Sequence, residues 1–160
     1  MSVAFRRESD EEHLEPKFEL PLPPGPNLVT PRGLALIEAR NAALDAAVAA
    51  ATPEQLPELQ RDLRYWRARL ATAQLAPPAS GEIVAFGTTV TIEQDGTTRS
   101  LAIVGHDESE PAAGRIAFTA PLAKVLIGSE AGEEIDPPGP GGTITVIAIA
   151  VLGDGRENLL

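Results

Sequence analysis

The sequence predicts an α+β protein in which a helical hairpin precedes a small, mostly antiparallel β-sheet with one short helix. Apolar residues recur at steps of three and four between residues 30 and 76, the spacing of a helix with one apolar face. From residue 82 onward the apolar period changes to two, which is typical of strands. We therefore expect a coiled-coil hairpin over residues 30–76, a linker rich in proline over 77–81 and a second domain over 82–152.

Two heptad stripes, separated by Thr52-Pro53, define the arms of the predicted hairpin. Their positions are Leu34, Ile37, Asn41, Leu44, Val48 and Ala51, then Leu56, Leu59, Leu63, Trp66, Leu70 and Ala73. Thr30-Pro31 favours the first helix start, because Thr caps free amides and Pro loses no hydrogen bond there. The second arm starts at Pro53 or Pro57, and Gln55 is placed for a capping box with Thr52. A polar residue at Asn41 can set the register of the seam, within one chain or between two.

The second half of the chain contains strand and turn signals in close succession. Asp95-Gly96 predicts a two-residue hairpin turn that places Val90 opposite Leu101. Further short strands are expected over residues 83–86 and 115–119, and a short helix over 121–127. The β-branched run over residues 144–152 predicts a strand buried on both faces. With aromatic residues at 4%, the core of this sheet is expected to be aliphatic.

Composition restricts the classes of function. The net charge of −10 argues against a protein that binds duplex nucleic acid, since that needs a basic face. The absence of cysteine excludes disulfides, thiolate metal sites and thiol nucleophiles. The sequence also lacks a Ser/His/Asp set, a phosphate-binding glycine loop and a histidine cluster, so we expect no catalytic residues, metal or cofactor. Without an apolar run of membrane-spanning length or a signal-peptide core, the expected location is the cytoplasm.

Charged residues gather at the ends of the chain and along the second arm. Residues 1–29 are acidic and rich in proline, and residues 153–160 are polar, so both are expected to be tails. The second arm carries four arginines, which form either the solvated face of the helix or a surface for an acidic partner. These are Arg61, Arg64, Arg67 and Arg69.

Five short segments, in this order, resemble the bacterial Gre transcript-cleavage factors in a variant with a short coiled coil. They are Leu28-Val29-Thr30-Pro31-Arg32-Gly33-Leu34, Val84-Ala85-Phe86-Gly87-Thr88-Thr89-Val90, Ile103-Val104-Gly105-His106-Asp107-Glu108, Ala120-Pro121-Leu122-Ala123-Lys124-Val125-Leu126-Ile127-Gly128 and Gly132-Glu133-Glu134. The resemblance implies an antiparallel coiled coil followed by a domain of the FK506-binding-protein type. It also implies binding at the secondary channel of RNA polymerase, with Asp107, Glu108, Pro121 and Leu122 as the docking residues.

The chain departs from the Gre pattern at two places. The family carries an Asp and a Glu three residues apart at the hairpin tip, which help to hold a second Mg²⁺ in the polymerase active site. Here the tip has no such loop and the hairpin is shorter by a few turns, which leaves Glu54 and Glu58 as candidate tip acids. The second departure is Ala120, where the family usually has a helix-capping Ser.

We therefore expect a Gre-like accessory factor that binds polymerase and modulates elongation without efficient stimulation of transcript cleavage. One alternative is a regulator of another protein, like the short-hairpin Gre relatives described as nucleoside diphosphate kinase regulators. A prolyl isomerase is a third reading, suggested by the domain type. That reaction needs an aromatic-lined pocket, whereas the second half of the chain offers only Phe86 and Phe118.

Overall fold

The computed structural model describes residues 19–153, so most of both predicted tails lies outside the described residues. Two compact units make up the described chain. The hairpin unit contains residues 19–25 and Ile37–Thr72, and the sheet unit contains Pro26–Leu36 and residues 73–153. The boundary therefore falls inside the first helix, whose first turns belong to the sheet unit.

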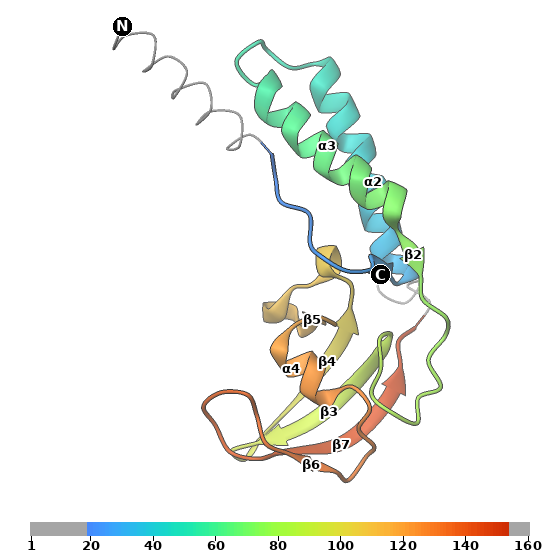
Figure 1. Ribbon diagram of the computed structural model, residues 1–160, viewed down its shortest axis with the longest axis vertical. Helices are drawn as coiled ribbons and strands as arrows, with labels where there is room; N and C mark the ends of the chain where they lie inside the picture. The colour runs from blue at the N-terminus through green and yellow to red at the C-terminus, as the bar shows by residue number, and fades with distance from the viewer. Residues whose placement is uncertain (1–18, 154–160) are drawn as a thin grey trace, which may run out of the picture. The chain divides into compact units, whose positions relative to one another are not determined.

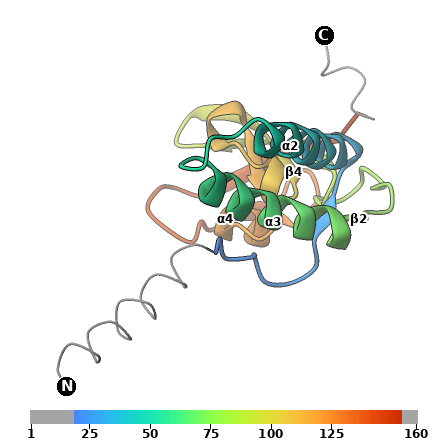
Figure 2. The ribbon, with the colours of Figure 1, turned by 90° about the horizontal axis from the view of Figure 1, so that it is seen from above.

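Two helices form the hairpin, and they lie side by side in both views of the ribbon (Figures 1 and 2). Helix α2 spans Pro31–Ala49 and helix α3 spans Leu56–Thr72. The second arm was expected to start at Pro53 or Pro57, and α3 begins one residue before Pro57. Ile37 and Leu63 are buried at the seam as expected, but Leu70 is 37% exposed and Arg69, one of the four arginines, is buried instead.

Asn41 joins the two arms of the hairpin. Its side chain is only 7% exposed. The Nδ2 atom donates to the backbone oxygens of Ile37 and Trp66, both at 2.9 Å. Because Trp66 lies on α3, the second bond fixes the register of the hairpin as a polar seam residue is expected to do.

A five-stranded sheet with the order β5-β4-β3-β7-β6 forms the centre of the sheet unit. The strands are β3 (Thr88–Gln94), β4 (Thr97–Val104), β5 (Arg115–Ala117), β6 (Glu134–Ile135) and β7 (Ile144–Val151). All neighbours are antiparallel except β4 and β5, which pair in parallel. A separate parallel pair joins β1 (Leu28–Val29) to β2 (Gln74–Leu75), at the start of α2 and just after α3. Residues 28 and 29, expected in the tail, are therefore part of the sheet unit.

The predicted turn between β3 and β4 is confirmed. Asp95 and Gly96 both have positive φ angles, 53° and 79°, which the two-residue turn requires. The resulting register pairs Val90 with Leu101, as expected. The Asp95 carboxylate also accepts a hydrogen bond of 3.0 Å from the Gly142 amide, so this turn holds the glycine-rich loop before β7.

One predicted strand is absent, and the predicted burial of another was wrong. Residues 83–86 form no strand. Instead, the Val84 amide donates to the Ser129 oxygen at 2.9 Å and the Gly128 amide donates to the Val84 oxygen at 2.7 Å. Strand β7 is buried only over its first half, and Ile147 and Val151 are exposed. The alternation of buried and exposed residues breaks at a β-bulge, where Ile92 pairs with Val146 and Thr91 with Ala148, so that Ile147 has no partner on β3.

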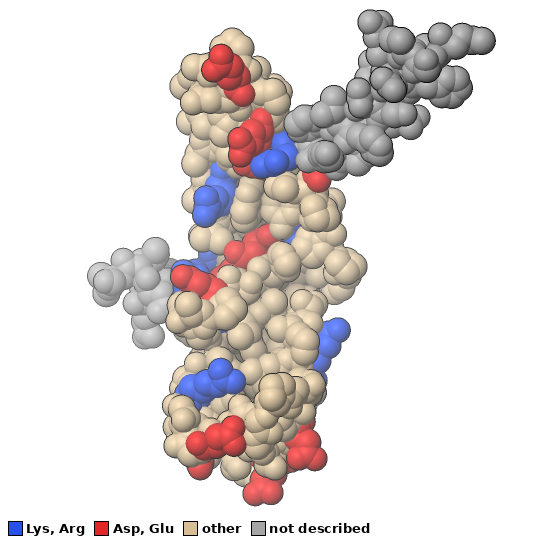
Figure 3. Space-filling view, turned by 90° about the vertical axis from the view of Figure 1, so that its left-hand side faces the viewer, with Lys and Arg blue, Asp and Glu red and all other residues tan. Residues whose placement is uncertain are grey.

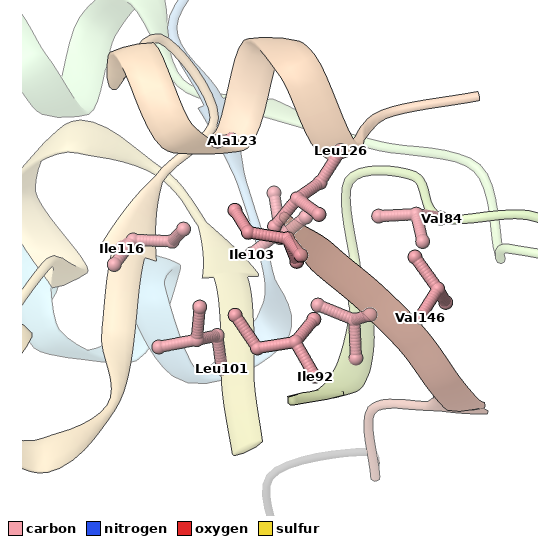
Figure 4. Close-up of a cluster of buried hydrophobic side chains, with 10 residues drawn as sticks. Val84, Ile92, Leu101, Ile103, Ile116, Ala123, Leu126 and Val146 are labelled. Carbon is pink, nitrogen blue, oxygen red and sulfur yellow. The ribbon is translucent and has the colours of Figure 1, made fainter. Parts of the chain in front are cut away.

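Helix α4 (Pro121–Leu126) covers one face of the sheet and closes the core (Figures 1 and 4). The buried cluster is entirely aliphatic, as the low aromatic content predicts. It consists of Val84, Val90, Ile92, Leu101, Ile103, Ile116, Ala123, Leu126, Ile144 and Val146. Phe118 packs against this cluster and meets Phe86 edge to face, with ring centroids 5.5 Å apart.

Candidate functional site

The Glu108 carboxylate lies in a buried network at the start of α2. Glu108 ends the short 3-10 helix His106–Glu108 and is only 6% exposed. Its Oε1 accepts a hydrogen bond of 2.5 Å from Thr30 Oγ1, and its Oε2 accepts one of 3.1 Å from Arg32 Nη1. Thr30 Oγ1 in turn accepts a bond of 3.0 Å from the Gly33 amide, as expected for the residue that caps α2. Both carboxylate oxygens are therefore engaged inside the sheet unit.

Two glycines allow the segments of this network to approach closely. A Cβ at Gly33 would lie 2.8 Å from Glu108 Oε1, and a Cβ at Gly105 would lie 2.3 Å from the Leu28 oxygen. Neither distance is tolerated without movement of the neighbouring atoms. The predicted motifs around Thr30 and around Glu108 thus pack directly against each other, although Thr30 and Glu108 are 78 positions apart in the sequence.

The other residues suggested for docking lie nearer the surface. Asp107 is half-buried in the same 3-10 helix as Glu108. Pro121 is exposed at the first position of α4, and the half-buried Leu122 packs against the core. Glu108 therefore differs from the other three, because its carboxylate is buried and hydrogen-bonded within the sheet unit.

The N-terminus of α4 lacks the side-chain cap that Ser would supply. Ala120 has an extended backbone (φ −64°, ψ 146°), which suits a capping residue, and no side chain caps the helix. We predict that Ala120→Ser raises the free energy of unfolding by about 1 kcal/mol, because its hydroxyl would accept a backbone N–H of the first turn. Urea unfolding followed by circular dichroism measures the change. Ala131→Ser, at an exposed position outside the helix, is the control and should change stability by less than about 0.5 kcal/mol.

The hairpin tip carries both candidate acids at its surface. The Gln55 side chain accepts a hydrogen bond of 3.2 Å from the Thr52 amide, which is one half of the predicted capping box. Glu54 is exposed in the turn, and Glu58 lies in the first turn of α3 with a distance of 3.7 Å to Arg61 Nη2. Acids at the start of a helix are favoured by its dipole, so this placement is also what stability alone would give.

Arginines of α3 are largely paired with acids of the hairpin unit. Arg64 contacts Glu19 at 2.6 Å, and Arg67 contacts Asp45 of α2 at 2.9 Å. On the face drawn in Figure 3, basic and acidic side chains alternate along the hairpin and do not merge into one basic surface. This distribution fits the solvated face of a helix better than a surface for an acidic partner.

An apolar cavity of about 230 Å³ lies in the sheet unit beside β1 and β2. Phe86 is the only aromatic residue that lines it. Its other lining residues are Val29, Thr30, Pro31, Ala76, Pro77, Pro78, Ala79, Gly87, Val151, Leu152 and Gly153. Within residues 19–153, no group of three or more His, Asp or Glu side chains is arranged to hold a metal ion, and no helix is long and apolar enough to cross a bilayer.

Comparison with known proteins assigns the chain to a family. Residues 79–151 match the family model for the C-terminal region of the GreA/GreB transcription elongation factors. Transcription elongation factor GreA of Desulfovibrio desulfuricans is 33% identical over 123 residues, which cover 74% of this chain and 73% of that protein. The chain belongs to the GreA/GreB family. GreA of Nitratidesulfovibrio vulgaris strain Miyazaki F is similarly related to this Gre-family chain, at 34% identity over 121 residues, 73% of the chain and 72% of that protein.

The sequence similarity to the GreA proteins extends beyond residues 79–151, since the matched stretches are longer than that segment. A solved structure, GreA factor homolog 1 (Gfh1) of Thermus thermophilus, superposes with a TM-score of 0.40 at 18% identity, covering 79% of this chain and 99% of that one. The predicted Gre resemblance is confirmed by the relatives, and the predicted α+β architecture is confirmed by the elements described above.

Proposed function

We propose that this Gre-family chain binds RNA polymerase at its secondary channel and modulates elongation without efficient stimulation of transcript cleavage. Membership of the GreA/GreB family supports the polymerase as partner. The observation that carries the second half of the proposal is the tip between Ala49 and Leu56. There the chain passes from one helix to the next through a short turn in which Glu54 is the only acid.

The chemistry of cleavage explains why the tip matters. In a two-metal displacement, carboxylates complete the coordination of a hard cation at about 2.1 Å. With 19 residues in α2 and 17 in α3, the arms are about 28 and 26 Å long at about 1.5 Å per residue. A hairpin a few turns shorter than that of a cleavage factor loses about 5 Å of reach for each turn. Glu54 and Glu58 are then too far from the metal to act as ligands.

We infer that the chain itself is not an enzyme and acts through the polymerase, which places its action in the cytoplasm. A prolyl isomerase is less well supported, because the apolar cavity offers Phe86 alone where an aromatic-lined site for a proline ring is needed. A regulator of another protein, of the nucleoside diphosphate kinase regulator type, is the second candidate. The short hairpin favours it, and the test below distinguishes the two.

The test is transcript cleavage in backtracked polymerase complexes driven by a genuine GreA, with and without an excess of this protein. We expect at least about tenfold slower cleavage at saturation, because one channel cannot hold both factors. The variant Leu122→Glu, which places a charge at the half-buried start of α4, should need about tenfold more protein for the same effect.

Two other outcomes would contradict the proposal. Unchanged cleavage at saturating protein removes the shared binding site, and co-purification of a kinase in place of polymerase would then support the second candidate. Cleavage stimulated by this protein alone, at a rate close to that of GreA, would show that the tip acids reach the metal.

A further inference from the structure

A buried carboxylate is an unusual way to attach the start of a helix. Glu108 accepts hydrogen bonds from Thr30 and Arg32, at opposite oxygens, while Thr30 caps the first turn of α2 through the Gly33 amide. We call Thr30, Arg32 and Glu108 the base clamp. All three lie within the sheet unit, although Thr30 and Arg32 belong to the segment that opens α2.

We propose that the base clamp is a positioning device: it ties the first turn of α2 to the sheet unit, so that docking of the sheet unit on a partner controls the hairpin tip. This inference rests on the proposed function for the identity of the partner. Glu108 is then a positioning residue and not a docking residue, since it acts through Thr30 and Arg32.

The continuity of α2 makes such control mechanically reasonable. The helix runs without a break from Pro31 to Ala49, from the sheet unit into the hairpin unit. A helix without proline in its interior, a π-bulge or an inserted side chain curves only gently. A constraint on its first turn therefore acts along the rest of the helix. Release of that turn would let α2 move with respect to the sheet without loss of either core.

Energetics favour a specific role for the clamp over a general contribution to stability. The Glu108 side chain is 4% exposed and that of Arg32 is 29% exposed, so the pair gains little net free energy, because the carboxylate loses its water while the attraction is partly screened at the guanidinium. A hydrogen-bonded carboxylate instead imposes direction, since its partners must lie at defined distances and angles. The glycine at position 33 supports this role, because a side chain there would displace the carboxylate from Thr30.

The first test compares two substitutions of Thr30 in the full chain. Thr30→Val keeps the shape and removes the hydroxyl, whereas Thr30→Ser keeps the hydroxyl. We expect amide hydrogen exchange at Gly33 to become about tenfold faster in Thr30→Val and to stay within about twofold of the original protein in Thr30→Ser. Glu108→Gln keeps the size of the side chain but loses its charge, so its exchange rate at Gly33 should lie between those of the two Thr30 variants. Glu93→Gln, on an exposed part of β3, is the control for this substitution.

The second measurement follows the hairpin directly. Because the chain has no cysteine, spin labels can be placed uniquely at Ala50→Cys and Thr98→Cys, both at exposed positions, one at the tip and one on β4. We expect the distribution of label distances to become about twofold broader with Thr30→Val and to be restored with Thr30→Ser. Unchanged exchange at Gly33 together with an unchanged distribution in Thr30→Val would overturn the proposal.

A polymerase assay separates positioning from mere stability. In the competition assay, the concentration of Thr30→Val that gives half-maximal inhibition of cleavage should stay within about twofold of that of the original protein. Its maximal inhibition should fall by at least about half. A purely structural role predicts instead that binding weakens in step with stability, and that result would also overturn the proposal. If the original protein leaves cleavage unchanged, the proposed function fails, while the exchange and distance measurements still decide whether the clamp positions the hairpin.

Discussion

Replacement of Gly105 by Ala is expected to lower the free energy of unfolding of the sheet unit by about 3 kcal/mol. The backbone of Gly105 is ordinary (φ −76°, ψ 170°), so any residue could adopt it. The obstacle is space, because the added methyl carbon would lie 2.3 Å from the Leu28 backbone oxygen. That oxygen belongs to β1, which pairs with β2 and cannot rotate away as a side chain could. The two segments must separate, and the base clamp opens with them.

Urea unfolding monitored by circular dichroism measures this loss of stability. The control is Gly139→Ala, since a Cβ at that position would meet no atom within 4 Å and its φ is not positive. Trp66, the only tryptophan of the chain, lies in the hairpin unit, so its fluorescence follows that unit separately. A loss in Gly105→Ala no larger than that in Gly139→Ala would mean that the close approach to Leu28 is not rigid.

Replacement of Leu126 by Ala is expected to cost about 3 kcal/mol of stability and to weaken polymerase binding. Leu126 is completely buried between α4 and the sheet, so its truncation leaves a cavity in a core of closely packed aliphatic residues (Figure 4). Since α4 has only six residues and no side-chain cap, it depends on this packing for its place on the sheet. Pro121 and Leu122, which we propose as docking residues, lie on the same helix.

The neighbouring residue provides a matched control for Leu126. Ile127 is 39% exposed, so Ile127→Ala removes a side chain of equal size with a smaller loss of buried surface. We expect Ile127→Ala to lower the free energy of unfolding by about 1 kcal/mol, measured by urea unfolding, and to change the competition assay little. Equal losses for the two variants would show that α4 is held by its exposed residues and not by the core.

Local chemistry explains which parts of the fold were predictable. The Asp95-Gly96 turn depends on two residues that tolerate positive φ, and Asn41 stands out as the polar residue of an apolar stripe. Both signals are contained in a few consecutive residues. The expected strand at residues 83–86 failed because a short apolar run shows that residues are buried without showing which backbone they pair with. Val84 is indeed fully buried in the core, but its backbone hydrogen bonds go to the loop at Gly128 and Ser129.

The contacts of the candidate-site residues were harder to predict from the sequence than the elements of the fold. The resemblance to Gre factors directed attention to Asp107, Glu108, Pro121 and Leu122 as one group. The structure divides this group, because the Glu108 carboxylate is buried on Thr30 and Arg32. The glycines at positions 33 and 105 were a signal in the sequence, but a glycine alone does not name the atom that approaches it.

The sequence by itself determined the two helices of the hairpin, the β3–β4 register, the aliphatic core and the family, because each follows from periodicity, turn chemistry or similarity along the chain. Only the tertiary structure decided that β1 pairs with β2, that Arg69 is buried in place of Leu70, and that Glu108 holds the start of α2. These contacts join residues far apart in the sequence. Their geometry depends on how the packed segments approach one another, which no local pattern records.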